Sequence, residues 1–589
     1  MRTSRRSDDF RPWPNSGLYR LAVLIRYLDN TSCPKREVTV AACFHRRIAA
    51  WSLRLCLMAA ASANAGPLPE RVEKAAQAHV AAGLYQTLVF GVVDGDRREV
   101  VAFGRLDDGK APDGDTVYEI GSITKTFTAT LLARAVRSGR VTLDTPVAQL
   151  LPDFKIPTRG GKEITLGDLA THHSGLPRLP SNLLGKDPSN PYADYDAAKL
   201  KTFLAGYALP REPGAAYEYS NLGVGLLAFA LAQLDHTTYG ALIGEEILKP
   251  LGMTMSGTAF TAAMRARFAP GHDDTGDAAK NWDFDALAGA GAIRSAANDM
   301  LRYLKANMAI DASPLAAAMK LAQEPRSDMD KTARIGLVWM TTDKGIVWHS
   351  GMTGGYASFL GFTADGRRGV VILSNTAASV GDLGFATLDA SAPLAPAYQA
   401  IVLPAALLDE YEGTYRLADK FLLHVFRMDD RLFARATGQD AIPIFPSAPN
   451  EFFARVAGIS ISFTRDPDRL VKGLVLHQNG DRAAPKLSAL ELPPELREIV
   501  LDAAALGDYV GQYRFDFGVL DVVLKRGRLE AQLAGQRAFP IFASAKDRFF
   551  YKIVDAQLDF ARNAGGKVVA VVLHQNGRDI PALRVTTER

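Results

Sequence analysis

Short apolar runs that predict β-strands stand near both ends of a region spanning residues 67–391. At its start, residues 88–93 and 99–103 are rich in β-branched and aromatic side chains and flank Asp94-Gly-Asp96, a sequence typical of a hairpin turn. Three more such runs come near its end, at residues 346–348, 358–362 and 369–373. The pattern therefore predicts two β-rich blocks separated by a long intervening segment.

The intervening segment has the pattern of helices and loops. Residues 126–138 and 222–234 place apolar side chains at helical spacing, and loops rich in Gly and Pro connect such stretches. The simplest assembly is one antiparallel sheet built from both ends of the region, with helices packed on it. We therefore predict an α+β domain over residues 67–391.

The chain repeats itself after a proline-rich linker at residues 392–396. Three strings recur 97 or 98 residues further on: Tyr411-Glu-Gly-Thr-Tyr415 as Tyr509-Val-Gly-Gln-Tyr513, Phe452-Phe453 as Phe549-Phe550, and Leu476-His-Gln-Asn-Gly480 as Leu573-His-Gln-Asn-Gly577. Both copies alternate short β-rich runs with turns, which predicts two small antiparallel β-barrels at residues 404–490 and 500–589. The repeated His477 and His574 stand at predicted turns, where a structural role is the simpler interpretation.

The first 65 residues differ from the rest of the chain. They hold 11 Lys and Arg against 4 Asp and Glu, which leaves 57 basic and 60 acidic residues downstream, so the net charge of +4 comes from this leader. Residues 46–65 have the order of an export signal: two arginines, a short apolar stretch, and Ala63-Asn64-Ala65 as a cleavage site. Arg54 interrupts that stretch, and a buried N-terminal helix is the alternative. We expect a periplasmic or secreted protein.

Composition argues against several classes of protein. Cys33, Cys43 and Cys56 are the only cysteines and all lie in the leader, so we expect neither disulfides nor cysteine-ligated metal in the mature chain. No apolar run reaches the roughly 18 residues that a membrane-spanning helix needs, so we expect no integral membrane protein. The charge of the mature chain gives no reason to expect nucleic-acid binding. His272-Asp273-Asp274 lacks a partner to complete a metal site, and we expect no metal and no cofactor. These features leave the oligomeric state open.

Three short strings carry candidate catalytic chemistry. In the first, Ser122-Ile-Thr-Lys125, a helix that begins at Ser122 places Lys125 on the same face, because positions i and i+3 are neighbours. A serine hydroxyl needs a base within hydrogen-bond reach, and a lysine becomes that base when desolvation or positive neighbours lower its pKa. The helix N-terminus also directs N–H groups at a developing oxyanion. Alone, however, Ser-x-x-Lys is common on solvated helices.

The second string, Tyr219-Ser-Asn221, stands just before an apolar helix. In a catalytic interpretation, Tyr219 relays a proton to the leaving group and Asn221 hydrogen-bonds a substrate amide. The alternative is simple capping of the helix by Ser220 or Asn221.

The third string, His349-Ser-Gly351, is followed by Met352 and lies in a strand pattern. Gly351 would let a substrate backbone approach closely, and the Met352 N–H would complete an oxyanion hole with that of Ser122. His349 would polarise Tyr219 or, when protonated, bind a substrate carboxylate. A histidine buried in the core is the alternative.

Together these strings resemble the catalytic motifs of the class C β-lactamase and penicillin-binding serine hydrolase superfamily. The resemblance follows the family's order through Tyr118-Glu-Ile-Gly-Ser-Ile-Thr-Lys-Thr-Phe-Thr128, Leu169-Ala-Thr-His-His-Ser-Gly-Leu-Pro177, Glu218-Tyr-Ser-Asn221, Pro250-Leu-Gly-Met253, Gly289-Ala-Gly-Ala-Ile-Arg-Ser295 and His349-Ser-Gly351. It implies a site between a helical lobe and the sheet, and an acyl-enzyme at Ser122 that water hydrolyses. The two C-terminal repeats resemble lipocalin-like barrels.

This chain departs from the class C β-lactamases in its third motif, which begins with His349 where those enzymes have lysine. We therefore expect a peptidase with at most weak β-lactamase activity. Residues 176–182 and 188–194 resemble AmpH-type D-alanyl-D-alanine carboxypeptidase/endopeptidases, whereas the two barrels are similar to those of D-aminopeptidases. The expected substrate is a D-alanyl peptide or peptidoglycan fragment. The alternatives are a D-aminopeptidase, an esterase or amidase, and a penicillin-acylated binding or sensor protein.

Overall fold

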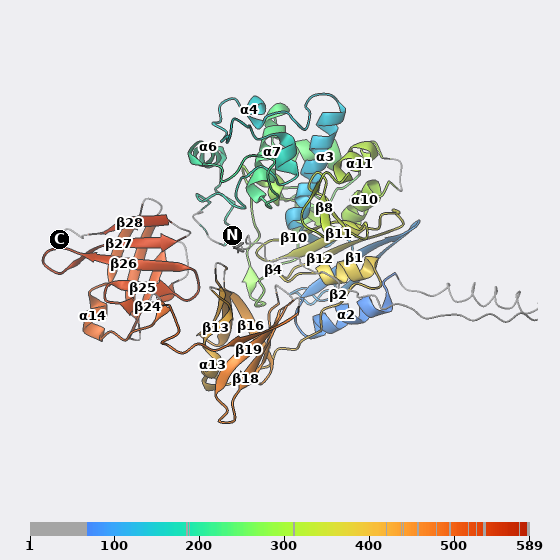
Figure 1. Ribbon diagram of the computed structural model, residues 1–589. Coiled ribbons are helices and arrows are strands. Elements are labelled where there is room, and N and C mark those ends of the chain that lie inside the picture. The colour runs from blue at the N-terminus through green and yellow to red at the C-terminus, as the bar shows by residue number, and fades with distance from the viewer. Residues whose placement is uncertain are drawn as a thin grey trace, which may run out of the picture.

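The computed structural model describes residues 67–585, apart from residues 184–186, 188, 310–312, 420, 438, 440, 456–458, 479, 494–495, 516–517, 526, 534–537 and 576–577. The predicted leader and its export signal at residues 1–65 lie outside this part of the chain. An α+β domain and two β-barrels follow one another along the described residues (Figure 1). None of the helices described has the length and hydropathy required to cross a bilayer.

One eight-stranded antiparallel sheet forms the centre of the α+β domain. Its strands, in spatial order, are β2 (Arg97–Gly104), β1 (Thr87–Asp94), β12 (Arg368–Ser374), β11 (Ala357–Phe362), β10 (Val347–Met352), β9 (Met340–Thr342), β8 (Ala333–Ile335) and β7 (Ser327–Asp328). β1 pairs with β2 on one side and with β12 on the other, so the two ends of the domain meet in the sheet. This confirms the predicted sheet and its hairpin, in which Asp94 pairs with Arg97 across a two-residue turn.

Helices cover both faces of this sheet (Figure 1). The side chains of β1 alternate between two cores, Val89 and Val93 in the larger and Leu88, Phe90 and Val92 in the smaller. The larger core includes α3 (Thr124–Arg137), α7 (Asn221–Leu234), α10 (Ala297–Asn307) and α11 (Ala316–Gln323). The smaller core includes α2 (Glu70–Ala81) and α12 (Gly381–Leu388).

Shorter elements connect these helices and frame the catalytic motifs. Two small antiparallel ladders join β3 (Val117–Glu119) to β6 (Arg294–Ala296) and β4 (Gly271–His272) to β5 (Ala278–Ala279). The short helices are η1 (Gly121–Ile123), α4 (Val147–Leu150), α5 (Leu166–Ala170), α6 (Ala197–Gly206), α8 (Tyr239–Ile243), η2 (Gly244–Leu248), α9 (Ala262–Ala266) and η3 (Ala288–Ala290).

The two C-terminal units are the predicted antiparallel barrels. In the first, α13 (Ala405–Tyr411) precedes β13 (Gly413–Ala418), β14 (Phe421–Met428), β15 (Arg431–Ala436), β16 (Ile442–Ala448), β17 (Glu451–Phe453), β18 (Ser460–Arg465), β19 (Val471–His477) and β20 (Asp481–Pro485). In the second, α14 (Ala503–Gly507) precedes β21 (Gly511–Phe515), β22 (Gly518–Lys525), β23 (Arg528–Leu533), β24 (Phe539–Ala545), β25 (Arg548–Tyr551), β26 (Ala556–Arg562), β27 (Val568–Gln575) and β28 (Arg578–Arg584). The second barrel is closed by pairing of β21 with β28, and a single bridge between Tyr415 and Lys486 brings the ends of the first together.

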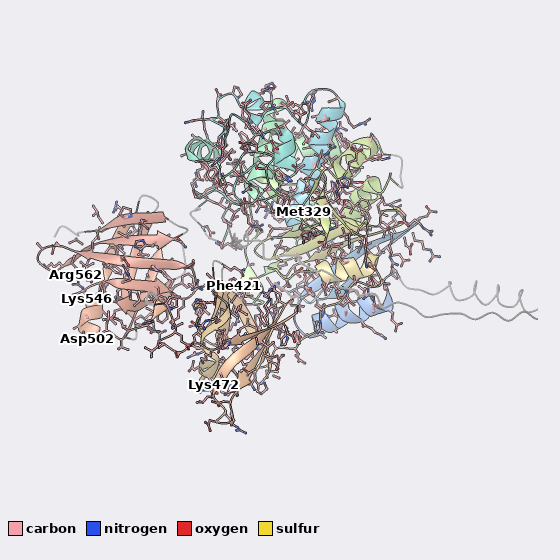
Figure 2. All side chains as sticks on the ribbon, viewed as in Figure 1. Met329, Phe421, Lys472, Asp502, Lys546 and Arg562 are labelled. Carbon is pink, nitrogen blue, oxygen red and sulfur yellow. The ribbon has the colours of Figure 1, made fainter. Side chains whose placement is uncertain are left out.

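The sequence repeat corresponds to repeated contacts inside the barrels. The Tyr415 hydroxyl donates to the Tyr411 carbonyl at 2.7 Å, and the Tyr513 hydroxyl donates to the Tyr509 carbonyl at 2.8 Å. All four tyrosine rings are buried. Arg562, labelled on the second barrel in Figure 2, donates to Asp547 and Asp508 at 2.8 and 2.7 Å. These contacts explain why the two tyrosines recur at the same spacing.

Candidate active site

The segment that carries Ser122 is held against the edge of a neighbouring strand. β3 ends at Glu119, and the turn of η1 leads through Ser122 directly into α3. Gly121 has a φ of 48°, and a Cβ at this position would lie 2.6 Å from the Met352 amide nitrogen. Glycine is therefore required at 121, and the close approach sets the Ser122 backbone beside Met352, where the oxyanion hole was predicted.

Lys125 is placed to act as the base for Ser122. Its Nζ lies 2.8 Å from the Ser122 Oγ and donates a hydrogen bond to the Ala290 carbonyl at 2.7 Å. The lysine side chain is fully buried, whereas Ser122 is partly exposed. Burial and the positive charge of Arg178 hold the pKa of Lys125 well below its usual range. An amine kept neutral in this way can accept the serine proton.

Tyr219 reaches the same point from the start of another helix. Ser220 caps α7 through its hydroxyl, which accepts the Gly223 N–H at 2.8 Å, so the capping alternative is confirmed for Ser220 and leaves its neighbours available. The Tyr219 ring centre lies 5.2 Å from the Lys125 Nζ. Burial raises the pKa of Tyr219 to about 12, so the phenol keeps its proton at neutral pH.

Asn221 begins α7 and presents an unpaired acceptor. Its Nδ2 donates to the Tyr192 hydroxyl at 3.3 Å, which orients the amide. Its Oδ1 is buried and has no hydrogen-bond partner among the described residues. A buried acceptor without a partner is costly, so this oxygen is suited to receive an N–H from a bound substrate.

His349 lies beside Tyr219 in a neutral form. Its Nδ1 is 2.6 Å from the Ser350 carbonyl, which can only accept, so the ring hydrogen is on Nδ1 and Nε2 is an acceptor. Burial and nearby Lys125 lower the pKa of His349 to about 3. The predicted binding of a carboxylate by protonated His349 is therefore not supported. The ring centres of His349 and Tyr219 are 6.4 Å apart, and Nε2 is buried without a partner.

Gly351 packs tightly against the segment that carries Ser122. A Cβ at this position would lie 2.0 Å from the Ile120 carbonyl oxygen and 2.5 Å from the Ser358 Oγ. The position that a side chain would take is thus occupied by the backbone just before Ser122. Gly351 therefore allows β10 to approach the Ser122 segment, and its predicted contact with a substrate backbone stays a prediction.

Two residues at the site were not predicted from the sequence as functional. The His172 ring lies 4.4 Å, centre to centre, from that of Tyr219, and its Nδ1 accepts the Ser220 N–H at 3.1 Å. Arg178 is exposed, with its guanidinium carbon 5.2 Å from the Tyr219 ring centre. His172 lies in the string at residues 169–177 that follows the family's order, and Arg178 comes directly after it. The available signal was that this string takes part in the resemblance together with the three candidate catalytic strings.

A buried carboxyl ties together the segments around the site. The Glu119 Oε1 accepts the Trp282 N–H at 2.8 Å and lies 3.7 Å from the Arg294 guanidinium. Burial outweighs the arginine and raises the pKa of Glu119 to about 7. Arg294 is itself buried and donates to the Trp282 carbonyl at 2.7 Å. Among the described residues, no cluster of three or more His, Cys, Asp or Glu is placed to hold a metal ion.

The fold and the grouping of Ser122, Lys125 and Tyr219 are those expected of the β-lactamase and penicillin-binding serine hydrolase superfamily, and a family comparison agrees with this. Residues 72–391 match the Beta-lactamase family, and this stretch is more than half of the chain. The chain therefore belongs to the β-lactamase family, which is the superfamily that the sequence resemblance predicted. Residues 398–492 and 497–584 each match a domain of unknown function, DUF3471, in agreement with two repeated barrels.

Relatives of the chain include a penicillin-binding protein and a D-alanyl-D-alanine-carboxypeptidase/endopeptidase. Penicillin-binding protein 4* of Bacillus subtilis is 26% identical over 404 residues, covering 62% of this chain and 86% of that protein. The D-alanyl-D-alanine-carboxypeptidase/endopeptidase AmpH of Escherichia coli is 31% identical over 224 residues, covering 37% of this chain and 57% of that protein. The chain thus matches little more than half the length of the second relative.

Solved structures are similar to about half of the chain. A D-alanine carboxypeptidase AmpC from Burkholderia cenocepacia has 23% identity and a TM-score of 0.44, covering 52% of this chain and 94% of that one. A class C β-lactamase from Rhodobacter sphaeroides has 27% identity and a TM-score of 0.46, with the same coverage.

Proposed function

We propose that this protein is a serine peptidase that forms an acyl-enzyme at Ser122 and releases D-alanine from peptides ending in D-alanyl-D-alanine. The observation that carries the proposal is the 2.8 Å contact between the Ser122 Oγ and the Nζ of buried Lys125. Family membership supports the serine hydrolase chemistry. The likeness to a D-alanyl-D-alanine-carboxypeptidase/endopeptidase supports the substrate class.

Acylation follows from the protonation states at the site. The Ser122 Oγ attacks the scissile carbonyl carbon while its proton passes to the Lys125 Nζ. The N–H groups of Ser122 and Met352 receive the developing oxyanion. As the C–N bond breaks, the Tyr219 hydroxyl donates a proton to the leaving amine and takes one back from Lys125. The high pKa of Tyr219 keeps it protonated for this step.

Deacylation uses the same groups in reverse. A water molecule attacks the ester carbonyl, its proton passes through Tyr219 to Lys125, and the Ser122 Oγ leaves with a proton from that lysine. The unpaired Asn221 Oδ1 accepts an N–H of the acyl chain. Neutral His349 presents an unpartnered Nε2 acceptor in the same buried cluster as Tyr219.

Intact-mass spectrometry against a panel of acyl donors tests this function. The panel contains penicillin G, an acyl-D-Ala-D-Ala peptide, a D-alanine amide and p-nitrophenyl acetate, each with the native protein and Ser122→Ala. We expect adducts at Ser122, release of D-alanine from the peptide, and neither in the variant. Adducts that persist in Ser122→Ala would reject the nucleophile. Turnover of the ester or the D-alanine amide without the peptide would favour the esterase or D-aminopeptidase alternatives.

A peptidoglycan substrate also requires that the enzyme reach the cell wall. We propose that residues 46–65 direct export and that the protein is periplasmic or secreted, as the order of basic, apolar and small residues indicates. Fractionation with N-terminal sequencing tests this, and a mature chain beginning at Gly66 is the expected result. Recovery of the uncleaved chain in the cytoplasm would contradict it.

A further inference from the structure

Arg178 is an exposed cation beside Tyr219 that lacks a neutralising carboxylate among the described residues. Among the described residues it makes no ion pair with a carboxylate, whereas nearby Arg211 is paired with Glu218. Its backbone carbonyl accepts the Asn221 N–H at 3.0 Å, so the loop that carries it is fixed to the start of α7. The guanidinium carbon lies 5.2 Å from the centre of the Tyr219 ring. Its charge also acts on Lys125 and Tyr192.

The other candidates for binding an anion here are neutral. Lys125 is the buried base, and His349 donates from Nδ1 to a carbonyl and has a pKa of about 3. Burial also holds the pKa of His172 well below its usual range. Arg178 therefore supplies the permanent positive charge that a carboxylate bound at this site would need.

We propose that Arg178 binds the free C-terminal carboxylate of the substrate's leaving residue and so makes the enzyme a carboxypeptidase. The inference rests on the proposed function and adds a specificity-determining residue to it. Guanidinium and carboxylate form two parallel charge-assisted hydrogen bonds of about 2.8 Å. Consecutive Cα atoms are about 3.8 Å apart, so the carboxylate of a single leaving residue lies only a few ångströms from the amine that Tyr219 would protonate, and this suits a guanidinium 5.2 Å from the Tyr219 ring centre.

A matched pair of peptides separates carboxylate binding from other effects of the arginine. One is an acyl-D-Ala-D-Ala peptide with a free carboxylate, and the other is its C-terminal amide, so both have the same scissile bond. The native enzyme should prefer the acid. Arg178→Gln should lower kcat/KM for the acid roughly ten- to a hundredfold, mostly through KM, and change the amide less than about threefold. Arg178→Lys, which keeps the charge, should retain an intermediate preference.

The pH profile controls for the electrostatic effect of Arg178 on the pKa of Lys125. Removing its charge raises the pKa of Lys125, so the acidic limb of kcat/KM should move to higher pH for both peptides in Arg178→Gln and stay in place in Arg178→Lys. Rates are therefore compared on the alkaline plateau. Arg178 is exposed, so the melting temperature should not change.

The outcomes distinguish this inference from the proposed function. Equal losses on acid and amide, or a native enzyme that cleaves both equally, would overturn the role of Arg178 while leaving Ser122 catalysis intact. Cleavage of neither peptide, with Ser122 still acylated by p-nitrophenyl acetate, would reject the proposed substrate and the carboxylate site with it.

Discussion

Gly351→Ala tests the close approach between β10 and the nucleophile segment. The new Cβ would lie 2.0 Å from the Ile120 carbonyl oxygen, and ordinary contacts begin at 3.4 Å, so Ile120 or β10 must move by about 1.4 Å. Overpacking of this kind costs about 1–3 kcal/mol, and each kcal/mol lowers the Tm of a domain this size by roughly 2–4 °C. Ile120 is two residues before Ser122, and a displacement near 1 Å at a reacting group costs about a hundredfold in rate.

Two assays on one variant distinguish the two roles considered for Gly351. We measure the Tm and the rate at which p-nitrophenyl acetate acylates Ser122, since this small ester needs no room along the strand. If Gly351 makes room for the protein's own backbone, both the Tm and the acylation rate fall. If it makes room for a substrate backbone, both stay at native values and only the peptide KM rises, and that result would refute our interpretation.

Gly244→Ala is the matched control. Gly244 is in a helical conformation, with a φ of −55°, and a Cβ there meets nothing within 4 Å. Alanine at such a position should leave the acylation rate unchanged and raise stability by about 0.4–1 kcal/mol. A fall in Tm for this control would show that glycine substitutions in this domain act through something other than local crowding.

Three further predictions concern the buried polar groups. Glu119 has a pKa raised from 4.5 to about 7, so burial of its charge costs stability as the pH rises from 4.5 through 7. Glu119→Gln should therefore gain about 3 kcal/mol relative to the native protein between pH 4.5 and 8 in urea titrations, and parallel pH curves would contradict this. Tyr219→Phe should slow acylation by about 10²–10⁴ at an unchanged Tm, and native rates in stopped-flow would exclude proton relay. Tyr415→Phe and Tyr513→Phe each leave a buried carbonyl unpaired and should cost their barrels about 1–3 kcal/mol in thermal unfolding, and a loss in only one would argue against equivalent roles.

Strand and helix periodicity determined the architecture of the chain. The runs at 88–93 and 369–373 are apolar on both faces, which is typical of a strand covered on both sides, and β1 and β12 lie side by side as the second and third strands of the sheet. The repeat of paired tyrosines predicted two equivalent units. In each barrel the second tyrosine makes the same hydroxyl-to-carbonyl contact with the first.

The short distance between Ser122 and Lys125 also follows from the local sequence. Three positions along a helix bring the two side chains together whatever surrounds them, and the structure places them 2.8 Å apart. Tyr219 and His349 are brought to them from distant elements, and their roles remain predictions that the variants above address.

Only the tertiary structure decided which groups at the site are charged and which positions the protein's own backbone occupies. The neutrality of His349 comes mainly from its burial among segments that are distant in the sequence, and no local pattern encodes that burial. Gly351 faces Ile120 because β10 packs against η1. Arg178 stands at Tyr219 because its loop is bonded to the start of α7. The sequence determined which groups could do chemistry, and the packing of distant segments determined which of them are charged, neutral or already in contact with the protein itself.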